Sequence, residues 1–217
     1  MKSKITILLI SFFSFSLLAN AQITKGSILL GGQVNFSHTS IKYPPIQDDD
    51  QITNAGSISL SGGKAINENS VIGLNLKFGY SNAYFRVIPS QRQKYTSYGA
   101  GIFYRKYKTL AKDFYFFLEG GLDYNYSNSN TKDSSGRELQ KVTQSGVELN
   151  LTPGISYKVL KNLHLEVSLP QMFSIGYAES KTSQQQSVSY KSDVVSVYSN
   201  LNSGLLNNLA VGFRLIF

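Results

Sequence analysis

The chain has 217 residues, a formal net charge of +8 and no cysteine. Charged residues make up only 16% of the chain, fewer than the roughly 25% of an average soluble domain. Without cysteine, disulfides, thiolate metal sites and lipid attachment to a cysteine are excluded, and we expect no cofactor. The positive charge suits an anionic partner, either a lipid surface or nucleic acid.

Residues 1–21 have the three-part layout of a secretory signal peptide. Two lysines precede an apolar run over residues 5–18, and the small residues Ala19-Asn20-Ala21 follow it. An uncleaved membrane anchor is the alternative, but the run is shorter than the roughly 20 residues that a spanning helix needs. We therefore predict cleavage after Ala21 and a mature domain over residues 22–217, and we expect no nucleic-acid partner for an exported chain.

Apolar and polar residues alternate in eight segments of the predicted mature chain, which is typical of β-strands with one apolar face. In the first segment, Leu30 and Val34 share one face while Gln33 and Asn35 share the other. The eight segments are residues 26–37, 57–63, 71–81, 98–106, 114–127, 146–158, 163–169 and 209–217. The sequence thus predicts an all-β fold.

The connections between these segments alternate between short and long. The short ones are the hairpin turns INEN, YKTLAKD and LKN, and the long, polar ones cover residues 38–52, 82–94, 127–142 and 178–193. Tight turns at one end and long loops at the other are typical of outer-membrane barrels. Both chain ends then lie on the short-turn side.

Residues 194–208 permit two interpretations, because they show some alternation of their own. They form either the upper part of a long eighth strand or a separate segment before it. We expect one long, bulged eighth strand, since a ninth strand would put the C-terminus at the wrong end of the barrel.

Alternation alone does not distinguish a lipid-facing barrel from a soluble barrel of the lipocalin or avidin kind. The polar face distinguishes them, because it carries mostly Gly, Ser, Asn and Thr, which suit a narrow interior better than a surface in water. The apolar face carries Tyr80, Tyr98, Tyr104, Tyr124, Tyr126 and Tyr157 toward the strand ends, where aromatic girdles lie. We predict an eight-stranded antiparallel up-and-down transmembrane β-barrel, in which the first strand pairs with the eighth.

Seven charged residues fall on the polar face, so we expect them inside the barrel: Lys77, Arg105, Glu119, Asp123, Glu148, Glu166 and Arg214. Buried charges are tolerated only when they are paired. Strand direction places Arg105 with Glu119, and Glu166 with Arg214, near the short-turn end, and places the other three around mid-height. We interpret the seven as a network that fills the lumen; a proton or ion path through it is the alternative.

The chain resembles the eight-stranded OmpA-like outer-membrane β-barrels of Gram-negative bacteria, in particular the single-domain outer membrane protein beta-barrel domain group. The resemblance rests on the Ala19-Asn20-Ala21 signal, on YGAGIFYRKYKTLAKDFYFFLEGGLDY, on LNLTPGISYKVLKNLHLEVSL and on the terminal pattern of Gly212, Leu215 and Phe217. It implies that this terminal pattern is the signal read by the outer-membrane barrel assembly machinery. It further implies an integral protein of the cell outer membrane, a monomer, that meets periplasmic chaperones during export.

Three functions remain open from the sequence. A structural or surface-interaction role is favoured, because long loops on a rigid scaffold are available for binding and carry basic residues that suit lipopolysaccharide: Lys42, Arg86, Arg92, Lys94, Lys132, Arg137, Lys141, Lys181 and Lys191. A narrow ion or small-solute pore is disfavoured, because open porin channels need about 16 strands. A barrel enzyme that modifies lipid A is the third possibility.

Only weak patterns support catalysis or metal binding. His38-Thr39-Ser40 has the His-x-Ser spacing of one catalytic arrangement, but it lies in a turn-rich stretch and we interpret His38 as a solvated residue. His164 is expected to point inward near the base. Asp48-Asp49-Asp50 offers a calcium site as an alternative, but such a site needs six to eight oxygens in a defined array, and we interpret the run as a solvated loop. We therefore predict no enzyme activity, no catalytic residue and no metal site.

Overall fold

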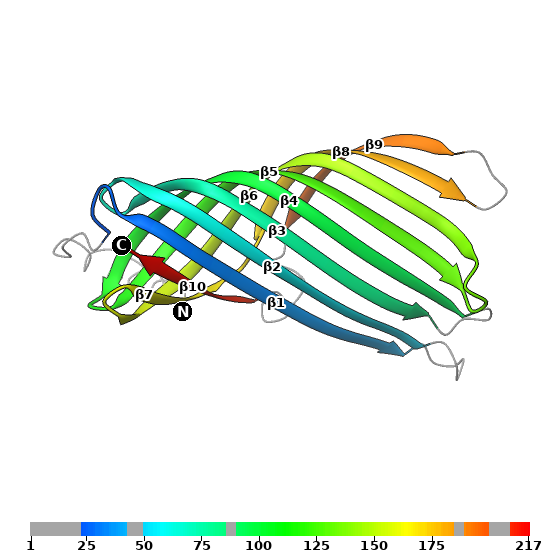
Figure 1. Cartoon of the computed structure of the whole chain (residues 1–217), viewed down its shortest axis with the longest axis horizontal. Coiled ribbons are helices and arrows are strands. Elements are labelled where there is room, and N and C mark those ends of the chain that lie inside the picture. The colour runs from blue at the N-terminus through cyan, green and yellow to red at the C-terminus, as the bar shows by residue number, and fades with distance from the viewer. Residues whose placement is uncertain (1–22, 43–49, 86–89, 185–188, 200–208) are drawn as a thin grey trace, which may run out of the picture.

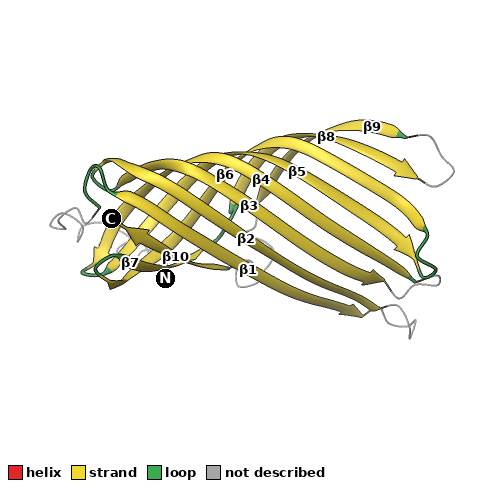
Figure 2. Cartoon of the chain, viewed as in Figure 1, coloured by secondary structure: helices red, strands yellow, loops and turns green. Residues whose placement is uncertain are grey.

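In the computed structural model, the described residues are 23–42, 50–85, 90–184, 189–199 and 209–217. Their regular secondary structure consists of β-strands (Figure 2). The strands are β1 (Ile28–Lys42), β2 (Asp50–Asn67), β3 (Ser70–Phe85), β4 (Gln91–Ala111), β5 (Phe114–Asp133), β6 (Glu138–Leu160), β7 (Leu163–Ser168), β8 (Phe173–Gln184), β9 (Tyr190–Ser199) and β10 (Ala210–Ile216). Within these described ranges, none of the chain forms a helix of the length and apolarity that crossing a membrane requires.

The strands form a ring of eight wall positions, and every pairing is antiparallel. Strands β1 to β6 fill six positions, β7 and β8 share the seventh along β6, and β10 and β9 share the eighth. The ring closes where β10 pairs with β1 from Val211 to Ile216. The predicted eight-stranded antiparallel barrel is confirmed, and its turns and C-terminus lie at one end, which we call the base (Figure 1).

Our expectation of one long, bulged eighth strand is wrong, because that wall position holds two separate strands. Ser199 of β9 pairs with Phe173, whereas Ala210 of β10 pairs with Ser168. The neighbouring position breaks at Pro170, which lacks a backbone N–H for the ladder, and at Gln171, whose φ is 51°. Within the described residues, β9 pairs with β8 alone, and β1 beyond Val34 pairs with β2 alone.

The four long loops are also shorter than predicted, because the strands continue through most of the polar stretches. The segments that connect the strands at the end opposite the base, which we call the rim, are residues 43–49, 86–90, 134–137 and 185–189. The parts of the strands next to the rim carry alternating Ser, Thr, Asn and Lys, and their backbones still pair. Polar residues suit both faces of the sheet there, because both faces are solvated beyond the membrane. The barrel wall therefore extends outward as paired strands.

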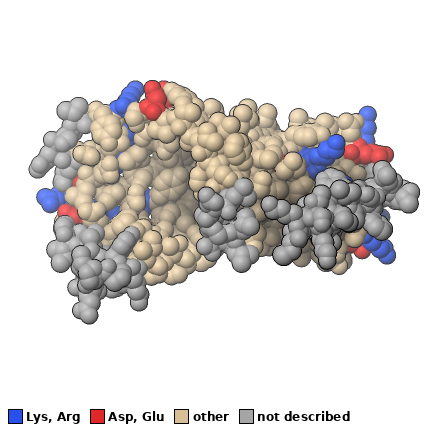
Figure 3. Space-filling model, turned by 180° about the vertical axis from the view of Figure 1, so that it is seen from behind, with Lys and Arg blue, Asp and Glu red and all other residues tan. Residues whose placement is uncertain are grey.

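The outward face carries a continuous apolar belt. Outward side chains include Leu74 at 65% exposure, Tyr98 at 56% and Leu149 at 58%, which would be costly in water but suits hydrocarbon. On the face seen in Figure 3, charged side chains lie toward the two ends and the band between them is largely free of charge. This pattern places the bilayer around the middle of the barrel.

The base of the lumen is apolar. The base cluster consists of Ile23, Leu29, Ala65, Val71, Phe103, Tyr107, Tyr115 and Phe117, all at 3% exposure or less. Ile23 precedes the first strand and is held there because its backbone exchanges hydrogen bonds with Asn69. The cluster closes the base because inward residues there are large.

Large inward side chains lie over inward glycines of neighbouring strands. A Cβ atom added at Gly154 would overlap Phe117 Cζ, and one added at Gly73 would lie 2.6 Å from Phe103 Cζ. Gly120, on the lipid-facing side, has nothing within 4 Å of such a Cβ. The inward glycines thus provide the volume that the base cluster occupies.

Gly154→Ala is therefore expected to lower the free energy of unfolding by about 1–3 kcal/mol, because the added methyl group displaces the Phe117 ring. Urea titration of the refolded barrel, followed by its heat-modifiable migration on a gel, measures this change. Gly120→Ala is the matched control and is expected to leave the midpoint unchanged. Equal midpoints for both variants would contradict the packing described here.

Candidate functional site in the barrel lumen

Four of the seven predicted interior charges form one cluster just above the base, the base network of Arg105, Glu119, Glu166 and Arg214. Arg105 Nε lies 2.7 Å from Glu119 Oε2, and Arg214 Nε lies 3.0 Å from Glu166 Oε1. These are the cross-strand pairs that strand direction placed together. Arg105 Nη1 also lies 2.8 Å from Glu166 Oε1, so Glu166 joins the two arginines across the barrel.

Aromatic and hydroxyl groups complete the base network. The guanidinium carbon of Arg105 lies 4.0 Å from the Phe117 ring centroid, a favourable cation–π distance. Arg105 Nη1 donates to Tyr107 Oη at 3.1 Å, and Tyr107 Oη donates to Glu166 Oε1 at 3.2 Å. Arg214 Nη1 donates to Ser61 Oγ at 3.1 Å. Two positive and two negative groups therefore lie over the base cluster with their hydrogen-bonding capacity largely used.

The other three predicted charges form an upper cluster of Lys77, Asp123 and Glu148. Lys77 Nζ and Asn150 Nδ2 both donate to Asp123 Oδ2. Glu148 Oε1 accepts a hydrogen bond of 2.6 Å from Gln171 Nε2. This cluster therefore contains one ammonium and two carboxylates, unlike the balanced base network.

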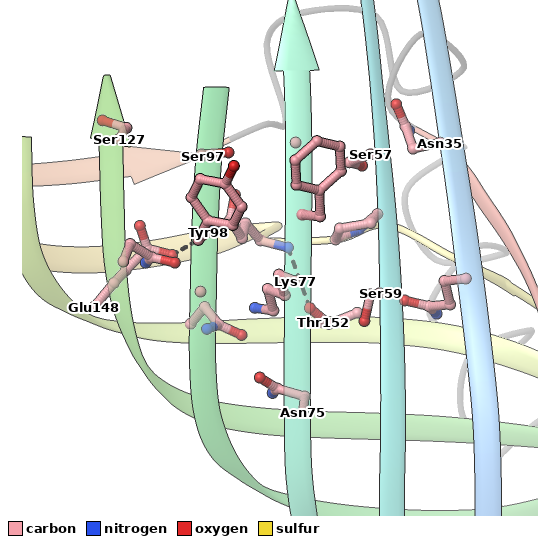
Figure 4. A pocket seen from close by; sticks show the side chains of 18 of the residues that line it. Asn35, Ser57, Ser59, Asn75, Lys77, Ser97, Tyr98, Ser127, Glu148 and Thr152 are labelled. Carbon is pink, nitrogen blue, oxygen red and sulfur yellow. Dashed lines mark hydrogen bonds between the residues drawn. The ribbon is translucent and has the colours of Figure 1, made fainter. Parts of the chain in front are cut away.

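Above the base network the lumen contains a cavity of about 430 Å³. Its floor includes Arg105, Glu119 and Arg214, and hydroxyl and amide groups from Asn35, Ser57, Ser59, Ser97 and Ser127 line its wall. Figure 4 shows these wall residues around Lys77 and Glu148. The cavity suits a small polar solute or ion, because polar groups surround it.

Several contributors were missed by the sequence reasoning, and one signal could have found some of them. Tyr107 and Phe117 share the strand parity of Arg105 and Glu119, so extending the alternation to the strand ends would have placed them inside, as it placed Phe103. Gln171 gave no such signal, because it reaches Glu148 from the break between β7 and β8. His164 is buried at the base, and its Nδ1 lies 3.0 Å from Ser156 Oγ.

The structure places one residue of the weaker sequence patterns, His38, beside an amide side chain. His38 Nδ1 lies 2.7 Å from the Asn54 side-chain oxygen on an exposed part of β1. Asp48, Asp49 and the Asp50 side chain lie outside the described residues. Elsewhere in the described ranges, no three His, Cys, Asp or Glu residues are grouped to hold a metal.

The predicted assembly signal lies on the closing strand. Phe217 exchanges two backbone hydrogen bonds of 2.9 Å with Ile28, and its side chain is 62% exposed. Gly212 faces Gln33, because an added Cβ would lie 2.6 Å from Gln33 Cγ. The recognition role of Gly212, Leu215 and Phe217 stays a prediction.

An antiparallel ring with an apolar outer belt, a packed base and a polar upper lumen defines a transmembrane β-barrel. The chain belongs to the family described as "Outer membrane protein beta-barrel domain", whose model matches residues 5–201. It is accordingly an outer-membrane protein. The family resemblance seen in the sequence is confirmed.

The chain is similar to several solved outer-membrane proteins. OprG from Pseudomonas aeruginosa has 13% identity and a TM-score of 0.50, covering 91% of this chain and 99% of that chain. A major outer membrane protein from Thermus thermophilus has 11% identity and a TM-score of 0.49, covering 88% of this chain and 99% of that chain. Among curated proteins, none matches the chain. At these identities, the OprG likeness establishes the fold alone.

Glu166→Gln is expected to destabilise the barrel by about 3–5 kcal/mol, because it leaves two buried guanidinium groups without their shared carboxylate. Urea unfolding of the refolded protein measures this loss. Glu138→Gln, at an exposed position on β6, is the control and is expected to change the midpoint little. A Glu166→Gln variant as stable as the wild type would show that the base network is not needed for the fold.

Proposed function

We propose that the protein is a structural outer-membrane barrel whose lumen is closed at the base and whose outward rim serves for surface interaction. The observation that carries this proposal is the base network lying directly over the base cluster. Arg105 and Glu166 are each 2% exposed or less, and Phe117 and Leu29 are completely buried. A free water path through this level would require these groups to separate.

The pore alternative is less well supported for the same reason. The cavity has the base network as its floor, and an eight-stranded barrel leaves space only for its own side chains or one small ligand. The lipid A enzyme alternative also receives little support, because His38 contacts an amide rather than a carboxylate or hydroxyl. We therefore assign no catalytic role.

Purified protein in planar bilayers is expected to show no long-lived conductance steps, because the base stays closed. Glu166→Gln is expected to produce brief openings by loosening the base network. The outward variant Leu149→Ala is the control and is expected to be as silent as the wild type. Stable, reproducible unitary conductance from the wild type would favour the pore instead.

We propose lipopolysaccharide as the partner of the outer wall next to the rim. A basic row of Arg92, Lys94, Lys132 and Lys141 lies outward on β4, β5 and β6, just beyond the aromatic residues of the belt. Arg92 pairs in register with Lys132, and Asn130 lies between Lys94 and Lys141. All four basic side chains are exposed. We propose that this height meets the phosphate groups of the outer leaflet, because it lies just beyond the belt and cationic side chains favour such groups.

Replacing all four residues of the basic row by glutamine is expected to weaken lipopolysaccharide binding at least tenfold, because four phosphate-directed charges are lost. Binding of purified lipopolysaccharide to the detergent-solubilised barrel, followed by fluorescence, measures the change. The pair Lys64→Gln and Lys106→Gln, exposed near the base, is the control and should bind as the wild type does. Unchanged binding by the quadruple variant would exclude this row as the site.

A further inference from the structure

The upper cluster contains one more negative than positive group. Asp123 and Glu148 are directly paired in register on β5 and β6, where two like charges repel each other. Lys77 contacts Asp123, whereas Glu148 receives the neutral Gln171 amide. By contrast, the base network is balanced, with two arginines and two glutamates. The imbalance is therefore local to the upper lumen.

Two buried oxygen atoms at the same level also lack a hydrogen-bond donor. These are Asp123 Oδ1 and Asn75 Oδ1, on residues that are 1% and 5% exposed. Asn75 and Asp123 flank Gly101 in the strand register, and Asp123 Oδ1 occupies the space where a Gly101 side chain would begin. Buried acceptors without a donor are costly, so this level of the lumen favours a group that brings positive charge or donors.

The cavity gives such a group access to this level. Asn75, Lys77 and Glu148 all line it (Figure 4), so a solute in the cavity meets the Glu148 carboxylate, and the unpaired amide oxygen of Asn75 is buried just behind the cavity surface. The donor atoms are carboxylate and amide oxygens, which are hard ligands for cations. A small cation can reach them without displacing the base network.

The charge count selects the class of cation. One positive charge balances the cluster. A calcium ion would need six to eight oxygens, and the described residues contain no group of three or more acidic or imidazole side chains suited to a metal. A divalent ion is therefore disfavoured. Sodium, potassium and a primary ammonium group share the required single charge. A proton on Glu148 is the competing way to remove the excess charge.

We propose that the upper lumen binds one monovalent cation, held by Glu148 and Asp123 and completed by the Asn75 amide oxygen. Occupation of this site neutralises the two facing carboxylates. It also stabilises the barrel wall between β3 and β6. The site is independent of the structural role proposed above, because it lies above the base network and outside the basic row.

Thermal unfolding of the refolded barrel at constant ionic strength tests this site. Sodium, potassium or methylammonium chloride is exchanged against tetrapropylammonium chloride, whose cation is too bulky for a polar pocket between strands. Binding is expected to raise the midpoint by about 3 to 5 °C per tenfold rise in the bound cation above half-saturation. A response to the metal ions identifies an inorganic ligand, and a response to methylammonium alone identifies an organic amine.

Glu148→Gln is expected to abolish the response and to unfold at the same temperature in every salt, because it removes the excess charge. Glu138→Gln, an exposed acid on the same strand, is the matched control and should keep the wild-type response. If Glu148→Gln fails to refold, the wild-type salt series still decides. Equal midpoints in all four salts would overturn the proposal and indicate a proton on Glu148. A Glu148→Gln variant that keeps the response would also overturn it, because the cation would then bind elsewhere.

Discussion

The constraint on which this structure depends is that hydrocarbon offers no partner to a backbone N–H or C=O group, so the chain must pair these groups itself. A ring of antiparallel strands meets that requirement where β10 pairs with β1 from Val211 to Ile216, and the two hydrogen bonds between Ile28 and Phe217 complete the ladder at the base. Because pairing fixes strand direction, it also fixes which side chains face lipid. The apolar belt and the polar lumen are therefore consequences of the same alternation.

The narrow lumen imposes the second condition, that its space be filled without leaving charges unpaired. Large inward side chains such as Phe117 lie over glycines such as Gly154, and Glu166 lies between two arginines. The base is thus closed by apolar packing and by balanced charge at adjacent levels. Higher up, a polar cavity remains and the charges do not balance, which is why the proposed cation site lies there.

Alternation predicted the wall, the faces and the cross-strand charge pairs, because each of these follows from period two and strand order. It did not predict that Arg105 reaches Glu166, because that contact crosses the lumen between strands that are not neighbours. The break at Pro170 and Gln171 was missed as well, because apolar alternation continues on both sides of it. The four long polar stretches were predicted as loops, but most of their backbone is paired in strands. The sequence did not indicate these strands, because a strand that is solvated on both faces shows no alternation of apolar and polar residues.

The orientation of the alternating faces is the central claim, and spin labels measure it most directly, because the chain has no native cysteine. Ser59→Cys and Leu60→Cys place labels at adjacent residues of β2, one lining the cavity and one on the belt at 54% exposure. In lipid vesicles, the label at position 60 should be relaxed strongly by oxygen dissolved in the bilayer, and the label at position 59 only weakly. Equal accessibility at both positions, or the reverse order, would contradict a barrel whose apolar face meets lipid.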